Sequence, residues 1–178
     1  VNPGGTLTMT FPKSVGQIPL YYAHKNTGRP LKEGKWFEKF RSNYLDVDND
    51  ALYPFGYGLS YTTFRFSDIT LNRSSIGMDN ELVASVTVTN TGDRAGSEVV
   101  QLYIRDLVGS VTRPVKELKG FEKIYLQPNE SRTVRFTIAP EMLKFYNADL
   151  KFVAEPGDFD VMIGPDSRNV KTARFTLR

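Results

Sequence analysis

The sequence contains no cysteine, and this absence excludes three kinds of chemistry at once. A chain without thiols forms no disulfide, offers no thiolate nucleophile and builds no thiolate zinc site. The absence does not identify the compartment, because a domain of this size folds without covalent staples in oxidising and reducing environments alike.

Long apolar runs and tracts of like charge are missing as well. No stretch approaches the roughly 18 apolar residues that indicate a membrane-spanning helix, and no signal peptide heads the chain. Since the first residue is Val1 and not Met, we expect the natural start, with any targeting segment, to lie upstream. The 23 basic and 20 acidic residues are spread along the whole length, so the net charge of +3 forms no stripe for a polyanion. We therefore predict no membrane span and no nucleic-acid partner.

The dominant pattern is an alternation of apolar and polar residues from Leu82 onward, which is the period of half-buried strands. Turn-forming residues separate the runs, as in Glu155-Pro156-Gly157-Asp158. With the segment from Phe64 to Leu71, the pattern predicts seven or eight short antiparallel strands in an all-β, two-sheet sandwich. The alternating apolar residues are Leu82, Ala84, Val86 and Val88; Val100, Leu102 and Ile104; Ile124 and Leu126; Val134, Phe136 and Ile138; Phe159, Val161 and Ile163; and Ala173, Phe175 and Leu177.

Two segments depart from this pattern. Gly120 interrupts the alternation, so we expect a bulge that lets both Leu118 and Phe121 face the core. The stretch from Ala139 to Tyr146 favours a helix of about two turns that connects two strands. Its inward-facing side chains are expected to be Met142, Leu143 and Tyr146.

The first 60 residues follow neither the helical nor the strand period and are rich in proline and glycine. They predict a mostly irregular arm with short extended pieces. An arm of this length is uncommon within one compact domain, so we expect it to pack on a domain that lies upstream. The aromatic side chains expected to be buried in that contact are Trp36, Phe37, Phe40, Tyr44 and Tyr53.

Two segments partly match known metal- or cofactor-binding motifs, but each lacks residues that its motif requires. The segment Asp46-Val47-Asp48-Asn49-Asp50 begins like a calcium loop, but Ala51 and Tyr57 stand where that loop needs Gly and a bidentate Glu. We interpret it as a solvated acidic turn. The Gly56-Tyr57-Gly58 segment lacks the third glycine and the strand–helix context of a dinucleotide site, and we interpret it as a turn.

Candidate catalytic groups are equally incomplete. The single histidine, His24, has no Gly-x-Ser-x-Gly nucleophile to serve, so we expect a structural or surface role. Glycoside cleavage needs two carboxyl groups on either side of the scissile bond, and the acidic residues here lie mostly in turns or on outward strand positions. We therefore assign no catalytic, cofactor-binding or metal-binding residue, and no cofactor.

Several motifs in order resemble the C-terminal part of glycoside hydrolase family 3, which contains many bacterial β-glucosidases and β-xylosidases. The later motifs resemble the fibronectin type III-like domain that closes many of these enzymes, and the match runs nearly end to end. The motifs are Thr10 to Pro19 (TFPKSVGQIP), Asn26 to Pro30 (NTGRP), Tyr53 to Phe64 (YPFGYGLSYTTF), Val88 to Gly92 (VTNTG), Glu98 to Tyr103 (EVVQLY), Arg113 to Phe121 (RPVKELKGF) and Glu155-Pro156-Gly157.

The resemblance implies two regions. Residues 1–62 would be the tail of the family's α/β sandwich domain plus a linker arm, and residues 63–178 the fibronectin type III-like sandwich. Enzymes of this family are retaining, with an aspartate nucleophile on an N-terminal barrel and a glutamate acid/base from the next domain, and both precede this region. Ser67-Asp68-Ile69, expected in the first sandwich strand, lacks the Trp of the nucleophile's setting, so no catalytic residue is carried over to this chain.

The resulting hypothesis is a non-catalytic accessory module that supports the catalytic domains of a parent β-glucosidase-type enzyme, periplasmic or secreted by family resemblance. The segment from Tyr21 to Ser60 would lie between those domains and border the substrate entrance. An alternative is a carbohydrate-binding sandwich, in which Tyr103 and Tyr125 stack on the sugar rings of an oligo- or polysaccharide. A third reading is a fragment active by itself. An arm without its partner domain would fold back on the sandwich or dock onto a second copy.

Overall fold

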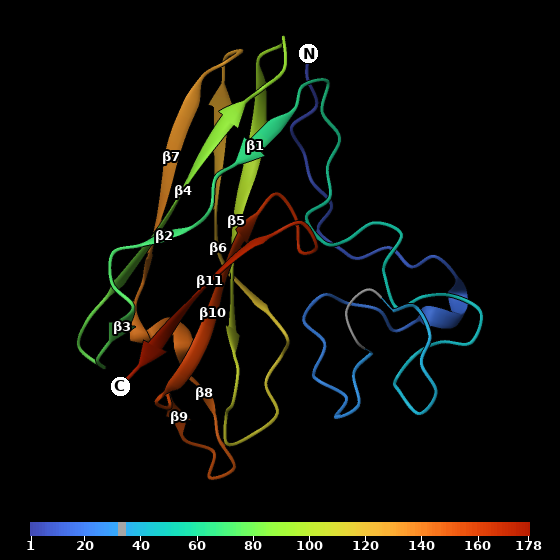
Figure 1. Cartoon of the computed structure of the whole chain (residues 1–178), viewed down its shortest axis with the longest axis vertical. Coiled ribbons are helices and arrows are strands. Elements are labelled where there is room, and N and C mark those ends of the chain that lie inside the picture. The colour runs from blue at the N-terminus through green and yellow to red at the C-terminus, as the bar shows by residue number, and fades with distance from the viewer. Residues whose placement is uncertain (32–34) are drawn as a thin grey trace.

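The computed structural model describes residues 1–31 and 35–178 and confirms an all-β sandwich preceded by a mostly irregular arm. Figure 1 shows the arm, coloured blue to cyan, to one side of the sandwich, on the right of the view. The strands are β1 (Phe64–Phe66), β2 (Thr70–Leu71), β3 (Ser75–Ile76), β4 (Leu82–Asn90), β5 (Gly96–Asp106), β6 (Glu117–Leu126), β7 (Ser131–Ile138), β8 (Phe145–Tyr146), β9 (Phe152–Val153), β10 (Gly157–Gly164) and β11 (Lys171–Leu177), and the single-turn 3₁₀ helices are η1 (Val15–Gln17) and η2 (Pro140–Leu143).

Two sheets form the sandwich. In the first, β1, β2 and β7 all pair with β4, and in the second the strand order is β3-β11-β10-β5-β6. The pairs are antiparallel except for β3 and β11, which run parallel. The strands β8 and β9 form a separate small hairpin.

The core lies between the facing sheets and contains the alternating residues that the sequence predicts, except Ala173, which is only partly buried. In β4 every second residue from Leu82 to Asn90 is buried, because successive side chains of a strand point to opposite faces. Its partner β7 brings Val134 directly opposite Val86. Each fully buried Val, Leu, Ile or Phe side chain contributes about 1.5–3 kcal/mol, so this interface dominates the stability of the fold.

The predicted strand from Phe64 to Leu71 is divided into β1 and β2. The backbone N–H of Thr87 on β4 donates to the side-chain oxygen of Ser67, at 2.9 Å, in place of a backbone carbonyl of a neighbouring strand. This side-chain bond interrupts the ladder, so Ser67, Asp68 and Ile69 lie between two strands and not within the first one.

The expected bulge in β6 is present, but both of its predicted core contacts are wrong, because Leu118 stands opposite Tyr103 on the outer face of the sheet. Leu102 pairs with Gly120 and Tyr103 pairs with Leu118, so Lys119 is the extra residue. Leu118 is partly buried, whereas Phe121 is 68% exposed. After the bulge the even-numbered residues face the core, and this phase places Phe121 on the outer face.

The predicted two-turn helix from Ala139 to Tyr146 is also wrong. One 3₁₀ turn, η2, is followed directly by β8, so the side chains after Leu143 alternate with the strand period. Met142 packs against the core and Leu143 is buried, as expected, but Phe145 takes the inward position and Tyr146 is exposed. No helix in the described ranges is long and apolar enough to cross a membrane.

The outer face of the first sheet is a ladder of hydroxyl groups. Thr87 and Thr133 lie 3.1 Å apart through their side-chain oxygens, and Thr89 and Ser131 lie 2.8 Å apart. These pairs stand on the outward positions of β4 and β7. Such a surface is compatible with direct contact with water.

The arm is held together by backbone bonds between its two ends. The N–H of Leu7 donates to the carbonyl of Tyr57 and the N–H of Gly56 donates to the carbonyl of Leu7, both at 2.8 Å. Gln17 is fully buried, and its side-chain nitrogen donates to the carbonyls of Asp48 and Asp50. Polar bonds, not an apolar core, therefore shape the arm.

The aromatic residues expected to contact an upstream domain lie mostly on the surface of this chain. Trp36, Phe37, Phe40 and Tyr53 are exposed, and Tyr44 is partly buried with its hydroxyl donating to the carbonyl of Gln17. Their burial against another domain stays a prediction.

A buried asparagine joins three ends of the sandwich. The side-chain oxygen of Asn90 accepts from the hydroxyl of Thr62 at 2.6 Å and from the N–H of Gly92 at 3.1 Å. Its amide nitrogen donates to the carbonyls of Arg94 at 2.7 Å and Leu126 at 3.1 Å. One side chain thus connects the end of β4, the entry to β1 and the end of β6.

Replacing Asn90 by Ala is expected to lower the free energy of unfolding by roughly 2–4 kcal/mol, since several buried polar groups lose their partners. Urea unfolding followed by circular dichroism measures this loss. The control Asn80→Ala, at an exposed turn, is expected to change stability by no more than about 0.5 kcal/mol. Equal effects of the two variants would contradict the assigned role of Asn90.

Candidate functional site

The outer face of β5 carries two buried side chains where the strand period predicts exposure. Gln101 is 3% exposed and Tyr103 is 0% exposed. This burial overturns the proposed sugar platform of Tyr103 and Tyr125, because a ring without exposed area cannot stack on a ligand. Tyr125 alone remains on the surface. Tyr103 is covered by the arm, whose docking site on β5 is the first feature of the candidate site.

Gln101 satisfies its buried amide through both the arm and the sandwich. Its nitrogen donates to the carbonyl of Pro165 at 2.5 Å and more weakly to that of Gly56 at 3.4 Å. Its oxygen accepts from the hydroxyl of Tyr103 at 2.5 Å. Burial raises the pKa of the Tyr103 phenol well above its ordinary value, with smaller contributions from Tyr22 and Asp166. The phenol is therefore a fixed donor and not a proton shuttle.

An aromatic ring of the arm, that of Tyr22, lies against Tyr103. The ring of Tyr22 lies 4.5 Å from the ring of Phe55 and meets the ring of Tyr103 edge-on at 5.6 Å. Such edge-to-face pairs contribute about 0.5–1.5 kcal/mol beyond the area that they bury. The two described segments of the arm, residues 1–31 and the segment from residue 35 onward, thus meet over one strand of the sandwich.

The turn between β10 and β11 completes the junction. Asp166 is 4% exposed, and its carboxylate accepts from the backbone N–H groups of Arg168 and Asn169, both at 2.8 Å. The N–H of Ser167 in this turn donates to the carbonyl of Phe55 in the arm at 2.9 Å. The carbonyl of Ser167 accepts from the ammonium group of Lys116 at 2.6 Å, and burial lowers the pKa of this lysine. The turn is therefore rigid and is attached to the arm.

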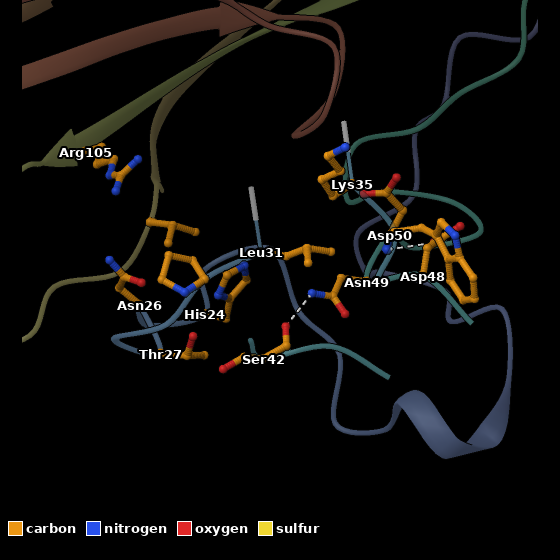
Figure 2. Close-up of a pocket in the computed structure, with 13 residues that line it drawn as sticks. His24, Asn26, Thr27, Leu31, Lys35, Ser42, Asp48, Asn49, Asp50 and Arg105 are labelled. Carbon is orange, nitrogen blue, oxygen red and sulfur yellow. Dashed lines mark hydrogen bonds between the residues drawn. The ribbon is translucent and has the colours of Figure 1, made fainter. Parts of the chain in front are cut away.

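A hollow of about 710 Å³ opens beside this junction, between the arm and the sandwich. Figure 2 shows Arg105 entering from the sandwich while the other labelled side chains come from the arm. The amide nitrogen of Asn49 donates to the carbonyl of Ser42 at 2.8 Å and braces one wall. The described residues that line the hollow are His24, Asn26, Thr27, Pro30, Leu31, Lys35, Trp36, Ser42, Asp48, Asn49, Asp50, Arg105 and Val115.

The acidic residues of the hollow include one carboxylate with a fixed partner. Asp48 pairs with the ammonium group of Lys13 at 2.6 Å, and this hydrogen bond is the largest cause of its lowered pKa. A carboxyl group held ionised in this way is a poor proton donor at neutral pH. The hollow thus offers an indole face and planar polar groups, which suit binding better than proton transfer.

The suspected calcium loop has another role in the structure. The carboxylate of Asp48 accepts from the N–H of Asp50 at 2.9 Å, which closes a local turn. Among residues 1–31 and 35–178 no group of three or more His, Cys, Asp or Glu side chains is placed to hold a metal ion. The absence of metal-binding residues in this chain stays a prediction.

The remaining sequence candidates lie apart from one another. The backbone carbonyl of His24 accepts from the N–H of Val115 at 2.9 Å, and its ring lies along the hollow. Gly56 adopts φ +84° in the turn that contacts Gln101. Asp68 is exposed and pairs with Lys171 at 3.1 Å. The junction residues Gln101, Tyr22 and Phe55 were not identified from sequence, because each has a decisive partner in a distant part of the chain: Pro165 for Gln101, Tyr103 for Tyr22 and Ser167 for Phe55.

Comparisons with known proteins agree with the fold. A fibronectin type III-like domain matches residues 98–167. The chain is 55% identical over 176 residues to a periplasmic β-glucosidase of Salmonella typhimurium, with 99% of this chain and 23% of the relative covered. It is 47% identical over 178 residues to a putative β-xylosidase of Formosa agariphila, covering 100% of this chain and 22% of the relative.

Comparison with solved structures also identifies similarity to β-glucosidases. A β-glucosidase from Listeria innocua in complex with glucose superimposes with a TM-score of 0.93 at 43% identity, over 99% of this chain and 24% of that one. The chain therefore spans about a quarter of the length of the relatives that it matches. The match includes the arm as well as the sandwich.

Gly56 provides a direct test of the junction. A Cβ atom at this position would lie 2.4 Å from the side chain of Gln101, so Gly56→Ala is expected to separate the arm from β5. Gly28→Ala is the matched control, because Gly28 has a similar φ of +77° and no atom of the described residues lies within 4 Å of the added Cβ. Both variants carry backbone strain of ~1 kcal/mol, and only G56A adds the clash.

Limited trypsin digestion measures the outcome. G56A is expected to be cleaved in the arm about tenfold faster than G28A, while circular dichroism shows an unchanged sandwich. Equal cleavage of the two variants would refute the assigned junction.

Proposed function

The chain corresponds to the C-terminal region of family 3 glycoside hydrolases, including their fibronectin type III-like domain, and on this premise we propose that it is a non-catalytic accessory module that supports the catalytic domains of a parent β-glycosidase. The observation that carries the proposal is the unequal distribution of apolar surface between the arm and the first sheet. Exposed apolar patches on a soluble protein commonly mark contacts with another surface.

The arm concentrates this apolar surface. Ten large apolar side chains among the described residues from 1 to 60 are at least half exposed, whereas hydroxyl pairs occupy the outer face of the first sheet. The side of the molecule that bears the arm is therefore the side proposed to face the catalytic domains. These side chains are Val1, Met9, Val15, Ile18, Tyr21, Trp36, Phe40, Leu45, Leu52 and Leu59.

The proposed division of the chain places residues 1–62 with the upstream α/β sandwich domain and its linker, and residues 63–178 in the fibronectin type III-like sandwich. The buried residues among the described part of the first segment are Gln17, Pro54, Gly56 and Thr62, none of which is a large apolar residue. A segment without an apolar core gains stability from neighbours. This supports an arm that belongs between domains.

The proposed parent is a retaining β-glycosidase that acts on glucosides or xylosides, with its nucleophile and acid/base upstream of this chain. The names of the Salmonella and Formosa relatives support this activity. The periplasmic relative supports a periplasmic or secreted location.

Reconstitution tests the accessory role. The Salmonella enzyme, truncated at the position that matches Val1, is expected to melt several degrees higher when this chain is added, because a bound partner stabilises the folded state. The chain has a single tryptophan, so 5-fluorotryptophan gives one ¹⁹F signal at Trp36 that should shift on binding.

Two lysine substitutions control this experiment. Phe40→Lys, on the exposed arm, is expected to weaken the stabilisation, whereas Thr137→Lys, on the outer face of β7, is expected to leave it unchanged. An unchanged melting temperature together with an unshifted ¹⁹F signal would count against the accessory role.

A second candidate function is oligosaccharide binding in the hollow. Trp36 is 59% exposed and shares the hollow with amide and hydroxyl side chains such as Asn26 and Thr27. An aromatic face with converging polar groups is the usual composition of a sugar site. The hollow would then border the substrate entrance of the parent enzyme.

Titration of the chain with gluco- and xylo-oligosaccharides, monitored by ¹⁵N chemical shifts, decides this second candidate. Binding is expected to shift the Asn26 and Thr27 amides, with no such shifts in Trp36→Ala. The control Tyr125→Ala, at an exposed aromatic residue of β6, should behave like the wild type. Identical shifts in W36A and Y125A would exclude the hollow as the site.

A further inference from the structure

One end of the hollow between the arm and the sandwich brings two cations together. Arg105 of β5 enters the hollow from the sandwich, as Figure 2 shows. The register of β5 and β6 pairs Ile104 with Glu117, so the next residues, Arg105 and Lys116, lie beside one another. Burial lowers the pKa of Lys116, and the charge of Arg105 lowers it further against the attraction of Asp166. Two positive charges therefore stand close together where the hollow meets the sandwich.

The guanidinium group of Arg105 has no acidic partner. No hydrogen bond or ion pair joins it to another residue within the described ranges. The carboxylate of Asp160, its neighbour across the β5–β10 pair, accepts instead from the Nε atom of Arg174 at 2.9 Å. The ammonium group of Lys116 donates to the uncharged carbonyl of Ser167. The wall of the hollow thus keeps a positive charge that no described carboxylate neutralises.

The acidic residues of the described lining lie elsewhere in the hollow. Figure 2 shows Asp48 and Asp50 well apart from Arg105. Asp48 is also neutralised by its own ion pair with Lys13 at 2.6 Å. An anion that enters beside Arg105 is therefore remote from both of these carboxylates.

The arm places an amide and an imidazole at the Arg105 end. Figure 2 shows Asn26 and His24 on this side of the hollow. Their segment is fixed to the sandwich, because the N–H of Val115 donates to the carbonyl of His24 at 2.9 Å. A guanidinium group offers a planar fork of N–H donors, which matches the two oxygens of a carboxylate. This end of the hollow therefore has the composition of a carboxylate site.

The remainder of the hollow suits a sugar better than a protein side chain. Trp36 is 59% exposed, and the side chains of Thr27, Ser42 and Asn49 add hydroxyl and amide groups to the lining. The volume of about 710 Å³ is typical of sites for small ligands. A protein carboxylate would use Arg105 alone. A sugar chain that carries a carboxylate would use the indole face, the polar groups and the guanidinium together.

We propose that the hollow is a site for acidic oligosaccharides, in which Arg105 binds the carboxylate of a uronic acid and selects such chains over neutral ones. This inference rests on the oligosaccharide binding proposed for the hollow as the second candidate function, and it adds the class of sugar. Trp36 supplies the stacking face, and Arg105 supplies the selectivity.

Isothermal titration calorimetry of the 178-residue chain with two matched probes tests the selectivity. The acidic probe is xylotriose that carries a glucuronic acid, and the neutral probe is the same molecule with its carboxyl group reduced to an alcohol. At low salt the acidic probe is expected to bind about tenfold more tightly or better, because bonds between charged groups are stronger than neutral ones. Most of this preference should disappear in about 0.5 M NaCl, which screens the charges.

Two arginine substitutions assign the preference to its residue. Arg105→Gln is expected to lower the affinity for the acidic probe to about that of the wild type for the neutral probe. The control Arg65→Gln replaces an exposed arginine of β1 that also has no partner within the described ranges, and it should keep the wild-type preference. Circular dichroism verifies that both variants fold.

Four results would contradict the proposal. Equal affinity of the wild type for both probes, or a preference that persists in R105Q, would remove the role of Arg105 and leave oligosaccharide binding intact. Absence of binding by both probes would exclude the hollow as a sugar site, while the accessory role is decided separately by the melting experiment. A capped glutamate peptide that binds as tightly as the acidic probe would assign the site to a protein carboxylate. The comparison of the two probes on the wild type remains decisive even if R105Q does not fold.

Discussion

The structure depends on satisfying one buried amide. The side chain of Gln101 points to the outer face of β5, where a strand residue normally meets water, and yet it is almost completely buried. A buried amide without partners costs several kcal/mol, so its donors and acceptors require the carbonyl of Pro165 and the hydroxyl of Tyr103. The bond to Pro165 keeps the turn after β10 on this strand, and the weaker bond from the same nitrogen to the carbonyl of Gly56 brings the arm to it. The sandwich thereby gains a cover on one of its two outer faces.

This cover gives the molecule two unlike sides. On one side the hydroxyl pairs of β4 and β7 bind each other and suit contact with water. On the other side the arm brings aromatic and aliphatic side chains to the surface while its interior is held by the polar bonds of Gln17. An accessory module between catalytic domains needs this combination, because a rigid sandwich then presents a surface that another domain completes.

Local patterns predicted the sandwich because alternation at Leu82 to Val88 and at Phe159 to Ile163 depends on neighbours two positions away. These patterns failed where contacts between distant parts of the chain decide whether a side chain is buried. Tyr103 has an outward phase in its own strand, and only Tyr22, some 80 positions earlier, explains its burial. Phe121 and Tyr146 were assigned to the core because a one-residue bulge and a strand in place of a helix each change the phase of later side chains. No acid pair for bond cleavage was identified from the sequence, and the hollow was not anticipated because its walls come from segments far apart in the chain.

The most direct test of the central claim is a proton NMR spectrum of the chain in water, focused on the hydroxyl proton of Tyr103. The account predicts a slowly exchanging hydroxyl resonance, shifted downfield by the bond to Gln101, with nuclear Overhauser contacts to the ring of Tyr22. A hydroxyl proton that exchanges freely with water, with no contact between these two rings, would show that the arm does not cover β5 and would contradict the account.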